Sequence, residues 1–408
     1  MWECDKTMRL AVSSVAMVLK YYGVDRDPFG NPTTPETVNN YFKRDEICMG
    51  DKCASLGYSQ GNIKWSAAGI YSSQSNKNFS SQKIVYIGPS DYNSESVKGQ
   101  IEAEKPVILR VPSREHWVVA TGIQNDTFLI NDPAYNRTAL DDPAYGNNAL
   151  AARNYQKTAS DFSSFEVTSL APSQILVTDS EGRRTRFDPS TSSAVEEIPN
   201  SFYYFEDAYD DPTDENPPPP SGSGVYIVLI LTPGQDEYKV ELIGEAGEEY
   251  SFFVHASDTD ANVDFNLFEG DISSGRAENE YFFNYISDPQ DEIEFSQQIH
   301  IDILPFVQRN FIFRKSRLPI PVAILSSSTF DIENVVTYSL RFGRTGNEES
   351  FLKCVPLRLD VNKDKLKDLI CLFSTQKSGF QMGDIEGTLS GETTLHASFK
   401  GADSVIVY

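Results

Sequence analysis

One segment near the N-terminus constrains the fold more than any other, because it carries the clearest helical pattern in the chain. The apolar residues that recur there at helical spacing are Val12, Val15, Ala16, Leu19 and Tyr22. Gly23 follows where a C-terminal helix cap is expected, so we predict a buried helix over residues 8–22. A second helix is predicted where Thr34, as N-cap, precedes Pro35 and Glu36.

Beyond Gly99 the hydrophobic pattern changes from helical to short strands. Three runs rich in Val and Ile, separated by turn residues, cover residues 106–111, 116–123 and 127–130. We predict that they form an antiparallel sheet packed on the first helix. From Gln174 onward short apolar runs alternate with Gly, Asp, Asn and Ser turns, and no long helical pattern returns. The expected fold class is therefore an α+β N-terminal domain followed by two all-β, sandwich-like domains.

The length of 408 residues suits three domains of ordinary size. We place them at residues 1–167, 168–300 and 301–408. The middle domain contains an acidic, proline-rich stretch, residues 207–224, whose composition predicts a loop or linker because it cannot bury a core. After this stretch the apolar runs 225–231, 238–243 and 250–254 are separated by Gly-containing turns, which predicts three successive strands joined by turns.

The charge balance limits the classes of partner. A formal net charge of -24 argues against a nucleic-acid partner, because phosphate binding needs clustered Lys and Arg. The longest apolar run, residues 225–231, is far shorter than the roughly 20 residues that cross a bilayer. No membrane span is therefore predicted, and the residues after Met1 do not follow a signal-peptide pattern.

The five cysteines leave at least one without a partner inside the chain. Cys48 and Cys53 share one short loop, and Cys354 and Cys371 bracket an acidic loop, so two local disulfides are sterically possible. Cys4 would then be left over. Such bridges would fit an exported protein. Five reduced thiols are the alternative that the spacing leaves open.

Two residues of the predicted sheet are candidates for chemistry. His116 begins an apolar strand and Asp132 follows the end of the next one, so an antiparallel hairpin would bring the two side chains together. Papain-like hydrolysis needs a thiolate nucleophile, a His that takes its proton, and an Asp or Asn that orients the His. His116 and Asp132 suit the last two roles. The alternative is a histidine at a strand end that only bonds a neighbour.

The segment from Ala11 to Gly23 resembles the nucleophile helix of double-glycine leader peptidase-like proteins. Segments similar to later motifs of that family follow in the same order: residues 57–65, residues 105–108, the His116 strand, and Asn131-Asp132-Pro133. The resemblance implies a papain-like cysteine peptidase domain that cleaves peptides after small residues such as Gly. It also implies that His116 is the general base and that Asp132 orients it.

The nucleophile of that family is unmatched in this chain. Its Gly-Cys pair falls, without gaps, on Arg9 and Leu10, and the Gln that it carries upstream for the oxyanion hole is missing, since the first Gln is Gln60. Cys4 could supply the thiol only if the start of the helix were rearranged. A truncated N-terminus is a further explanation for the missing cysteine.

A second local signal is the acidic loop at residues 360–369. Oxygen-bearing side chains stand at loop positions one, three, five and nine, which are Asp360, Asn362, Asp364 and Asp368. The Leu366 carbonyl can add a further ligand. A calcium ion needs six or more oxygens, and such spacing can supply them. The loop resembles the calcium loops of dockerin-like and integrin-like bacterial surface modules, with Lys363 and Lys365 in place of glycines. We therefore expect that this loop can bind a structural calcium ion. The alternative is a solvated acidic turn. No cofactor is expected to be required for the peptidase-type chemistry.

Three functional hypotheses follow. The first is an active cysteine peptidase whose thiol comes from Cys4 or from residues missing at the N-terminus. The second, which the replacement at Leu10 favours, is a non-catalytic papain-fold module that binds extended peptides. The third is an adhesive extracellular protein. The later segments resemble modules of secreted bacterial multidomain proteins, which implies a secreted or cell-surface location, a peptide or protein ligand and a possible cell-surface partner.

Overall fold

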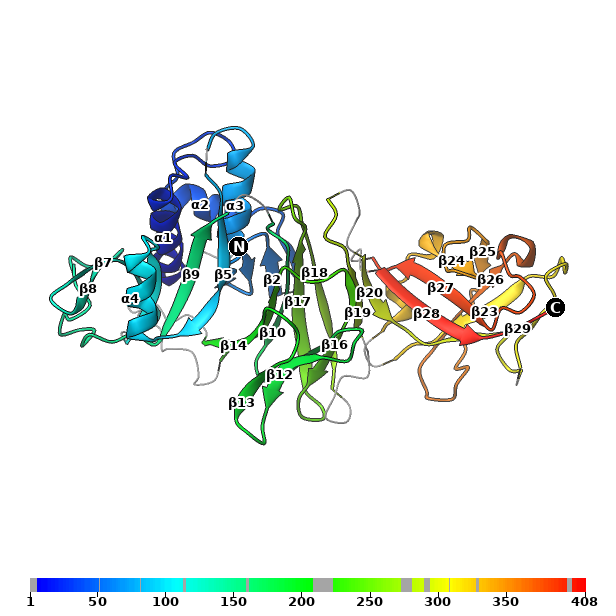
Figure 1. Ribbon diagram of the computed structural model, residues 1–408. Coiled ribbons are helices and arrows are strands. Elements are labelled where there is room, and N and C mark those ends of the chain that lie inside the picture. The colour runs from blue at the N-terminus through cyan, green and yellow to red at the C-terminus, as the bar shows by residue number, and fades with distance from the viewer. Residues whose placement is uncertain are drawn as a thin grey trace.

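The computed structural model describes residues 6–50, 52–80, 82–112, 115–158, 161–207, 223–272, 281–289, 294–307, 309–327, 330–394 and 398–408. Figure 1 shows three parts in a row: an N-terminal region of helices and strands, a middle pair of sheets, and a C-terminal β unit at the far end. The described chain is mostly β, as predicted, and its α-helices lie in the N-terminal region.

The N-terminal region packs helices on a five-stranded antiparallel sheet. Its helices are α1 (Lys6–Tyr21), α2 (Pro35–Phe42), α3 (Ala67–Asn76) and α4 (Ser94–Glu102). The sheet, in spatial order, contains β5 (Ile84–Asp91), β9 (Ala151–Lys157), β6 (Val107–Pro112), β7 (Glu115–Gln124) and β8 (Thr127–Asn131). The three predicted strands and the helix packed on them are confirmed, whereas β5, β9, α3 and α4 were not predicted. Thr34 caps α2 as expected, accepting a hydrogen bond from the Thr37 amide at 3.2 Å.

A small antiparallel sheet sits beside these helices. It contains β1 (Ile47–Met49), β2 (Lys52–Ser55), β3 (Tyr58–Ser59) and β4 (Asn62–Ile63). A disulfide joins Cys48 of β1 to Cys53 of β2, which stand directly opposite each other. A second disulfide joins Cys354 to Cys371 in the C-terminal unit, so both local bridges that the spacing allowed are present. Cys4 lies outside the described residues.

The middle part is built from two sheets. The first contains β14 (Ser201–Asp207), β15 (Gly224–Leu231), β10 (Ser164–Leu170), β17 (Glu249–Ser257) and β18 (Val263–Asp271). The second contains β13 (Ser193–Glu196), β12 (Arg184–Asp188), β11 (Gln174–Thr178), β16 (Asp236–Ile243), β19 (Tyr281–Tyr285) and β20 (Glu294–Gln298). The boundary that we placed after residue 167 falls inside β10, and most of the predicted loop 207–224 lies outside the described residues.

The three strands predicted over residues 225–254 are confirmed as β15, β16 and β17, but strands that follow one another in this run do not pair with each other. β15 and β17 both pair with β10, whereas β16 belongs to the other sheet and pairs with β11 and β19. The reason lies in burial on the two faces of each strand. The central residues of β15 are buried on both sides, while buried and more exposed residues alternate along β16, as in a strand with one face turned away from the core.

The two faces of β15 belong to different cores. Val225, Ile227 and Leu229 pack into the core of the N-terminal region, whereas Val228 and Ile230 pack between the two middle sheets. The first middle sheet is therefore covered by the N-terminal region on one side and by the second sheet on the other. The core of the N-terminal region therefore extends to one face of this sheet, while the core between the two middle sheets lies on its other face.

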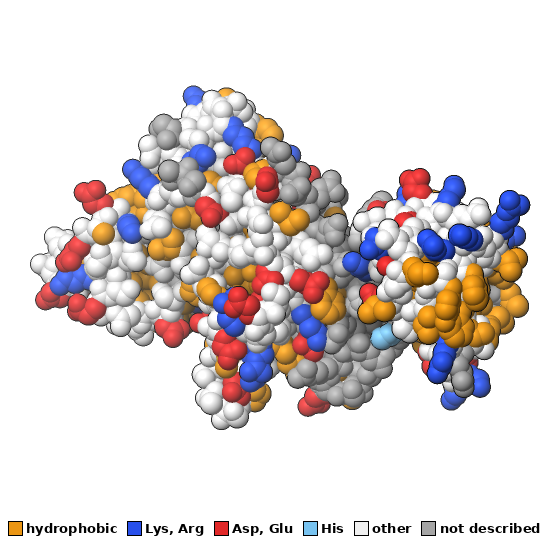
Figure 2. All heavy atoms as spheres, turned by 45° about the vertical axis from the view of Figure 1, so that its right-hand side comes forward, with side chains coloured by type: hydrophobic (Ala, Val, Ile, Leu, Met, Phe, Trp, Pro, Cys, Tyr) orange, Lys and Arg blue, Asp and Glu red, His pale blue; other side chains and the backbone are white. Residues whose placement is uncertain are grey.

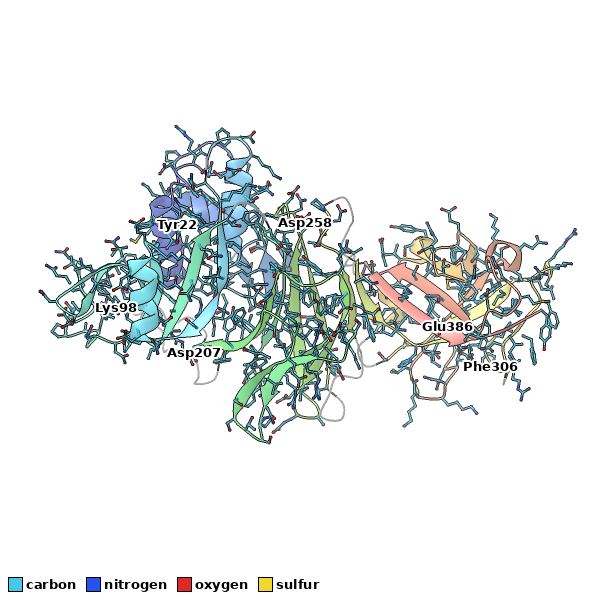
Figure 3. All side chains as sticks on the ribbon, in the orientation of Figure 1. Tyr22, Lys98, Asp207, Asp258, Phe306 and Glu386 are labelled. Carbon is cyan, nitrogen blue, oxygen red and sulfur yellow. A yellow bond between two sulfur atoms is a disulfide. The ribbon has the colours of Figure 1, made fainter. Side chains whose placement is uncertain are left out.

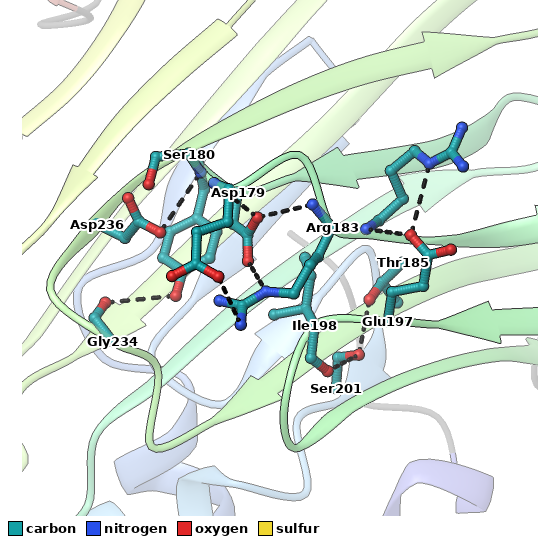
Figure 4. Close-up of polar contacts among 12 residues, drawn as sticks. Asp179, Ser180, Arg183, Thr185, Glu197, Ile198, Ser201, Gly234 and Asp236 are labelled. Carbon is teal, nitrogen blue, oxygen red and sulfur yellow. Dashed lines mark hydrogen bonds and ion pairs between the residues drawn. The ribbon is translucent and has the colours of Figure 1, made fainter.

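The hairpin between β11 and β12 is fixed by a single carboxylate. Asp179 accepts hydrogen bonds from the backbone amides of Glu181 and Arg183 and from Arg183 Nε, at 3.1, 2.9 and 2.7 Å. Figure 4 shows this group beside the hydroxyl pair of Thr185 and Ser201. Side-chain bonds of this kind to nearby amides are what favours Asp in turns.

The C-terminal unit has its own apolar core but continues the second middle sheet. β20 pairs in parallel with β28 (Ser398–Ser404), followed by β27 (Glu386–Glu392) and β24 (Arg341–Gly343). A four-stranded sheet contains β21 (Ile301–Ile303), β23 (Ile320–Ile324), β26 (Leu369–Phe373) and β25 (Phe351–Cys354). β22 (Phe311–Ile312) pairs with β29 (Ile406–Val407), and three short 3-10 turns cover Ile332–Asn334, Thr337–Ser339 and Thr375–Lys377.

Candidate functional site

The predicted hairpin brings His116 and Asp132 into direct contact. β7 and β8 are antiparallel, and His116 lies near the start of β7 while Asp132 directly follows β8. His116 Nε2 lies 2.9 Å from Asp132 Oδ1, and both side chains are buried. An imidazole that donates its Nε2 proton to this carboxylate keeps its Nδ1 lone pair free to accept a proton.

The Asp132 carboxylate is held by several donors. Its Oδ1 also accepts from the backbone amides of Ala134 and Tyr135, at 2.9 and 3.0 Å, and its Oδ2 accepts from the hydroxyl of Tyr145. Burial disfavours the charged carboxylate, but the hydrogen bonds from His116, Tyr145 and the two amides outweigh it and lower the pKa of Asp132 to about 2. Asp132 is therefore an anion at neutral pH with a fixed orientation.

An aromatic and cationic group surrounds this pair, and sequence reasoning missed it. Tyr145 stacks on the His116 ring with centroids 5.9 Å apart, and Tyr135 meets the same ring edge-on at 5.4 Å. Arg137 lies over the Tyr135 and Tyr145 rings and donates to the Tyr145 hydroxyl at 2.8 Å. All three residues come from the loop after β8, where no strand or helix period marks a position as inward-facing. Only the folded path of that loop returns Tyr145 to Asp132.

The second ring nitrogen of His116 is left open. His116 Nδ1 is buried, and no described residue forms a hydrogen bond with it. A buried polar atom without a partner is costly and calls for an explanation. In a cysteine peptidase this nitrogen would face the thiol. The free hydrogen-bonding position of Nδ1 is therefore the place where a nucleophile or a ligand would lie.

Helix α1 packs against β7, the strand that contains His116. Ser14 is fully buried and its hydroxyl donates to the backbone carbonyl of Trp117, the neighbour of His116, at 3.2 Å. Leu10 stands one helical turn before Ser14, on the same face of α1. Leu10 therefore lies on the side of α1 that faces β7, and its side chain offers neither a hydroxyl nor a thiol. The Ser14 hydroxyl is already bonded to the Trp117 carbonyl.

In the predicted calcium loop two residues other than glycine have left-handed backbone conformations, and the carboxylates do not converge on one point. Lys363 and Lys365 adopt left-handed conformations, with φ of 69° and 79°, as the glycines at those positions would. The carboxylate oxygens of Asp360, Asp364 and Asp368 do not all lie within 4.8 Å of one another.

The carboxylates of this loop bind backbone amides instead. Asp368 is buried and accepts from the amides of Ser326 and Val361, at 2.9 and 2.7 Å. Asp360 Oδ2 and Asp364 Oδ1 accept from the amides of Lys365 and Leu366, and the Asn362 amide group donates to Asp364 Oδ2. Asp360 Oδ1 is buried, and no described residue forms a hydrogen bond with it.

A separate cavity of about 380 Å³ lies between α2, α3 and the turn from β17 to β18. Its lining includes Phe29, Tyr41, Arg44, Lys77 and Asn262. None of its lining residues belongs to the His116 group, so it is not part of the candidate site. No helix in the described part of the chain is long and apolar enough to cross a membrane.

Comparison with known families supports the resemblance at a coarse level. Residues 11–161 match the profile of the Peptidase_C39 like family, a span that contains His116, Asp132 and Tyr145 and begins one residue after Leu10. No curated protein and no solved structure matches the chain. The N-terminal region is therefore a cysteine peptidase-like domain, joined to parts that are mostly β.

Proposed function

We propose that the N-terminal domain is a peptide-binding module that keeps the His-Asp pair of a cysteine peptidase but has lost hydrolysis, because its nucleophile is missing. The proposal rests on Leu10, the residue at which the resemblance places the peptidase cysteine, while His116 and Asp132 lie in contact at 2.9 Å. The four cysteines of the described chain are bonded in disulfides and supply no thiolate.

The retained pair has a role in binding. His116 Nδ1 accepts a hydrogen bond from a backbone amide of an extended peptide, and Asp132 keeps the ring in the tautomer that accepts. Leu10 offers the peptide an apolar contact in place of a thiol. The aromatic rings of Tyr135 and Tyr145 fix the imidazole, so the acceptor is held in place before the peptide arrives.

The proposal predicts that Cys4 does not react in a His116-dependent way. The intact, natively folded protein would be treated with a peptide-like, cysteine-directed inactivator, and adducts located by mass spectrometry in the wild type, in His116→Ala and in His300→Ala as a control. We expect no His116-dependent adduct on Cys4. The same peptide without its reactive group should bind the wild type, and His116→Ala should weaken this binding roughly tenfold. A rapid adduct on Cys4 that disappears in His116→Ala alone would establish an active peptidase instead.

We also propose that the protein works outside the cytoplasm, secreted or on a cell surface, with its β parts acting as binding modules. The two disulfides support this location, because such bridges persist in oxidising compartments.

We propose further that the loop at residues 360–369 binds one calcium ion, supported by the unpartnered Asp360 Oδ1 and the left-handed backbone at Lys363 and Lys365. Asp360, Asn362, Asp364 and Asp368 would provide side-chain ligands and Leu366 its carbonyl. Calcium at 100 times its Kd would then stabilise the folded unit by about 2.7 kcal/mol. Calorimetry with calcium and with a chelator measures this as a rise in Tm. Asp364→Asn should reduce the rise, and Asp384→Asn, outside the loop, should not; an unchanged wild-type Tm would leave the loop a solvated turn.

A further inference from the structure

The charge of the protein is distributed very unevenly along the chain. Residues 301–408 contain 13 Lys and Arg against 12 Asp and Glu, whereas the preceding 300 residues contain 22 against 47. Within the C-terminal unit no Asp or Glu occurs between Asp302 and Asp331, while Arg309, Arg314, Lys315 and Arg317 all fall there. This stretch is the part of an acidic protein that an anionic surface would attract.

The same stretch exposes large apolar side chains. We define the β22–β29 patch as Phe306, Val307, Phe311, Phe313, Leu318, Ile406 and Tyr408, whose exposed fractions run from 39% to 76%. Figure 2 shows hydrophobic side chains gathered over one face of the C-terminal unit, with Lys and Arg side chains around them. Scattered apolar residues are normal on a surface, but a contiguous group with a polar rim marks an interaction site.

Strand pairing and ring contacts join four members of the patch, which are Phe311, Phe313, Ile406 and Tyr408. β22 pairs in parallel with β29, which places Phe311 beside Ile406. The Tyr408 ring lies 5.9 Å from that of Phe311 and stacks on that of Phe313 at 5.6 Å. The Arg314 amide donates to the Tyr408 carbonyl at 3.2 Å, which ties the basic segment to the same edge.

The basic side chains beside the patch are available to a ligand. Arg309, Arg314, Lys315 and Arg317 are exposed, and none of them forms an ion pair with a described residue. The nearby carboxylate of Asp403 is occupied, because it accepts from the Ile303 amide and from Asn310. The patch therefore combines protruding apolar groups with unneutralised cations.

We propose that the β22–β29 patch binds the surface of a lipid bilayer that contains anionic headgroups. The rings of Phe306, Phe313 and Tyr408 would enter the boundary between headgroups and acyl chains, and the four cations would contact the headgroups. Charge complementarity selects this occupant. A symmetric dimer through the patch would set the same cations against each other, and aliphatic groups such as Leu318 and Ile406 cannot stack on nucleic-acid bases.

The position of the patch also orients the molecule. Phe306 lies at the end of the C-terminal unit, far along the molecule from Tyr22 and Lys98 of the N-terminal domain (Figure 3). Attachment through this end would direct the His116 site away from the bilayer, while the strongly acidic remainder would be repelled by the anionic surface.

Co-sedimentation of the full-length protein with vesicles tests the proposal. One set of vesicles contains phosphatidylcholine alone and the other contains phosphatidylcholine with a third phosphatidylglycerol. We expect binding to the anionic vesicles that weakens with added salt. The affinity should fall about fivefold in each of the variants Arg314→Gln, Lys315→Gln and Arg317→Gln. It should fall tenfold or more in the double variant Phe306→Ser/Phe313→Ser.

Matched controls lie on the same unit. Tyr338→Ser removes an 82% exposed aromatic side chain outside the patch, and Arg358→Gln removes a partly exposed cation outside it that pairs with Glu333 at 3.0 Å. Both should bind vesicles like the wild type, and unchanged thermal unfolding would show that all variants are folded. Absence of binding to the anionic vesicles, or binding that the patch variants leave intact, would overturn the proposal. Patch variants that change the mass in sedimentation equilibrium without changing vesicle binding would show a protein interface instead.

Discussion

Replacing Leu10 by Cys is expected to create a reactive thiol that depends on His116. Leu10 lies one helical turn before Ser14, on the face of α1 that contacts β7, and His116 Nδ1 is buried with no described partner. A thiol at this position would give its proton to the imidazole, which lowers the thiol pKa from its usual value of about 8.5. The experiment uses a Cys4→Ser background. At pH 6 the thiol introduced by Leu10→Cys should be alkylated roughly tenfold faster than a thiol that has no histidine beside it.

The control for this experiment uses the same helix. Lys20→Cys places a thiol on an exposed position in the last turn of α1, and its alkylation should proceed at the ordinary rate with or without His116. His116→Ala should remove the advantage of the Leu10→Cys thiol and leave the Lys20→Cys thiol unaffected. Equal rates at the two positions would contradict the alignment of Leu10 with the peptidase nucleophile, and with it the reason that we give for lost hydrolysis.

The second large effect is expected at the buried ion pair between the N-terminal domain and the middle sheet. Arg153 of β9 and Glu206 of β14 are joined at 2.7 Å, and their side chains are only 5% and 7% exposed. Glu206 also accepts from Trp65 Nε1 at 2.8 Å, and the Arg153 guanidinium lies over the rings of Trp65 and Trp117. Glu206→Gln should lower the free energy of unfolding by about 3–5 kcal/mol, because it leaves Arg153 as an uncompensated buried charge.

Urea unfolding followed by tryptophan fluorescence measures this loss, since Trp65 and Trp117 both contact Arg153. The double variant Arg153→Met/Glu206→Leu should recover much of the stability, because it removes both charges together. The matched control is Asp207→Asn, which breaks a less buried ion pair with Arg110 of β6, with side chains 48% and 18% exposed, and should cost no more than about 1 kcal/mol. A similar cost for Asp207→Asn and Glu206→Gln would show that burial does not distinguish the two pairs.

The candidate site was only partly predictable from the sequence. His116 and Asp132 could be paired because one short hairpin connects them, and hairpin geometry follows from local strand and turn patterns. Tyr145 and Arg137 could not be assigned, since they lie in a loop without periodicity, and only the course of that loop brings Tyr145 to Asp132 and Arg137 to Tyr145. The role of the open His116 Nδ1 required coordinates, because which side chains surround a ring nitrogen is decided by packing.

The sequence by itself determined the features that depend on neighbours in the chain. These are the helix that contains residues 8–21, the Thr34 cap, the sheet hairpin of His116 and Asp132, and the spacing that permits two local disulfides. Each arises from contacts between residues close in sequence, so propensity and period suffice to find it.

Only the tertiary structure decided how the parts join. The apolar run Val225–Leu231 predicted a buried strand. Its pattern could not show that Ile227 packs into the core of the N-terminal region while Val228 packs between the two middle sheets. Nor could it pair Arg153 with Glu206, or Lys64 with Glu166, across the resulting interface. The physical reason is that alternation along a strand records only that its two faces differ, whereas the partners of each face come from segments separated by tens to hundreds of residues.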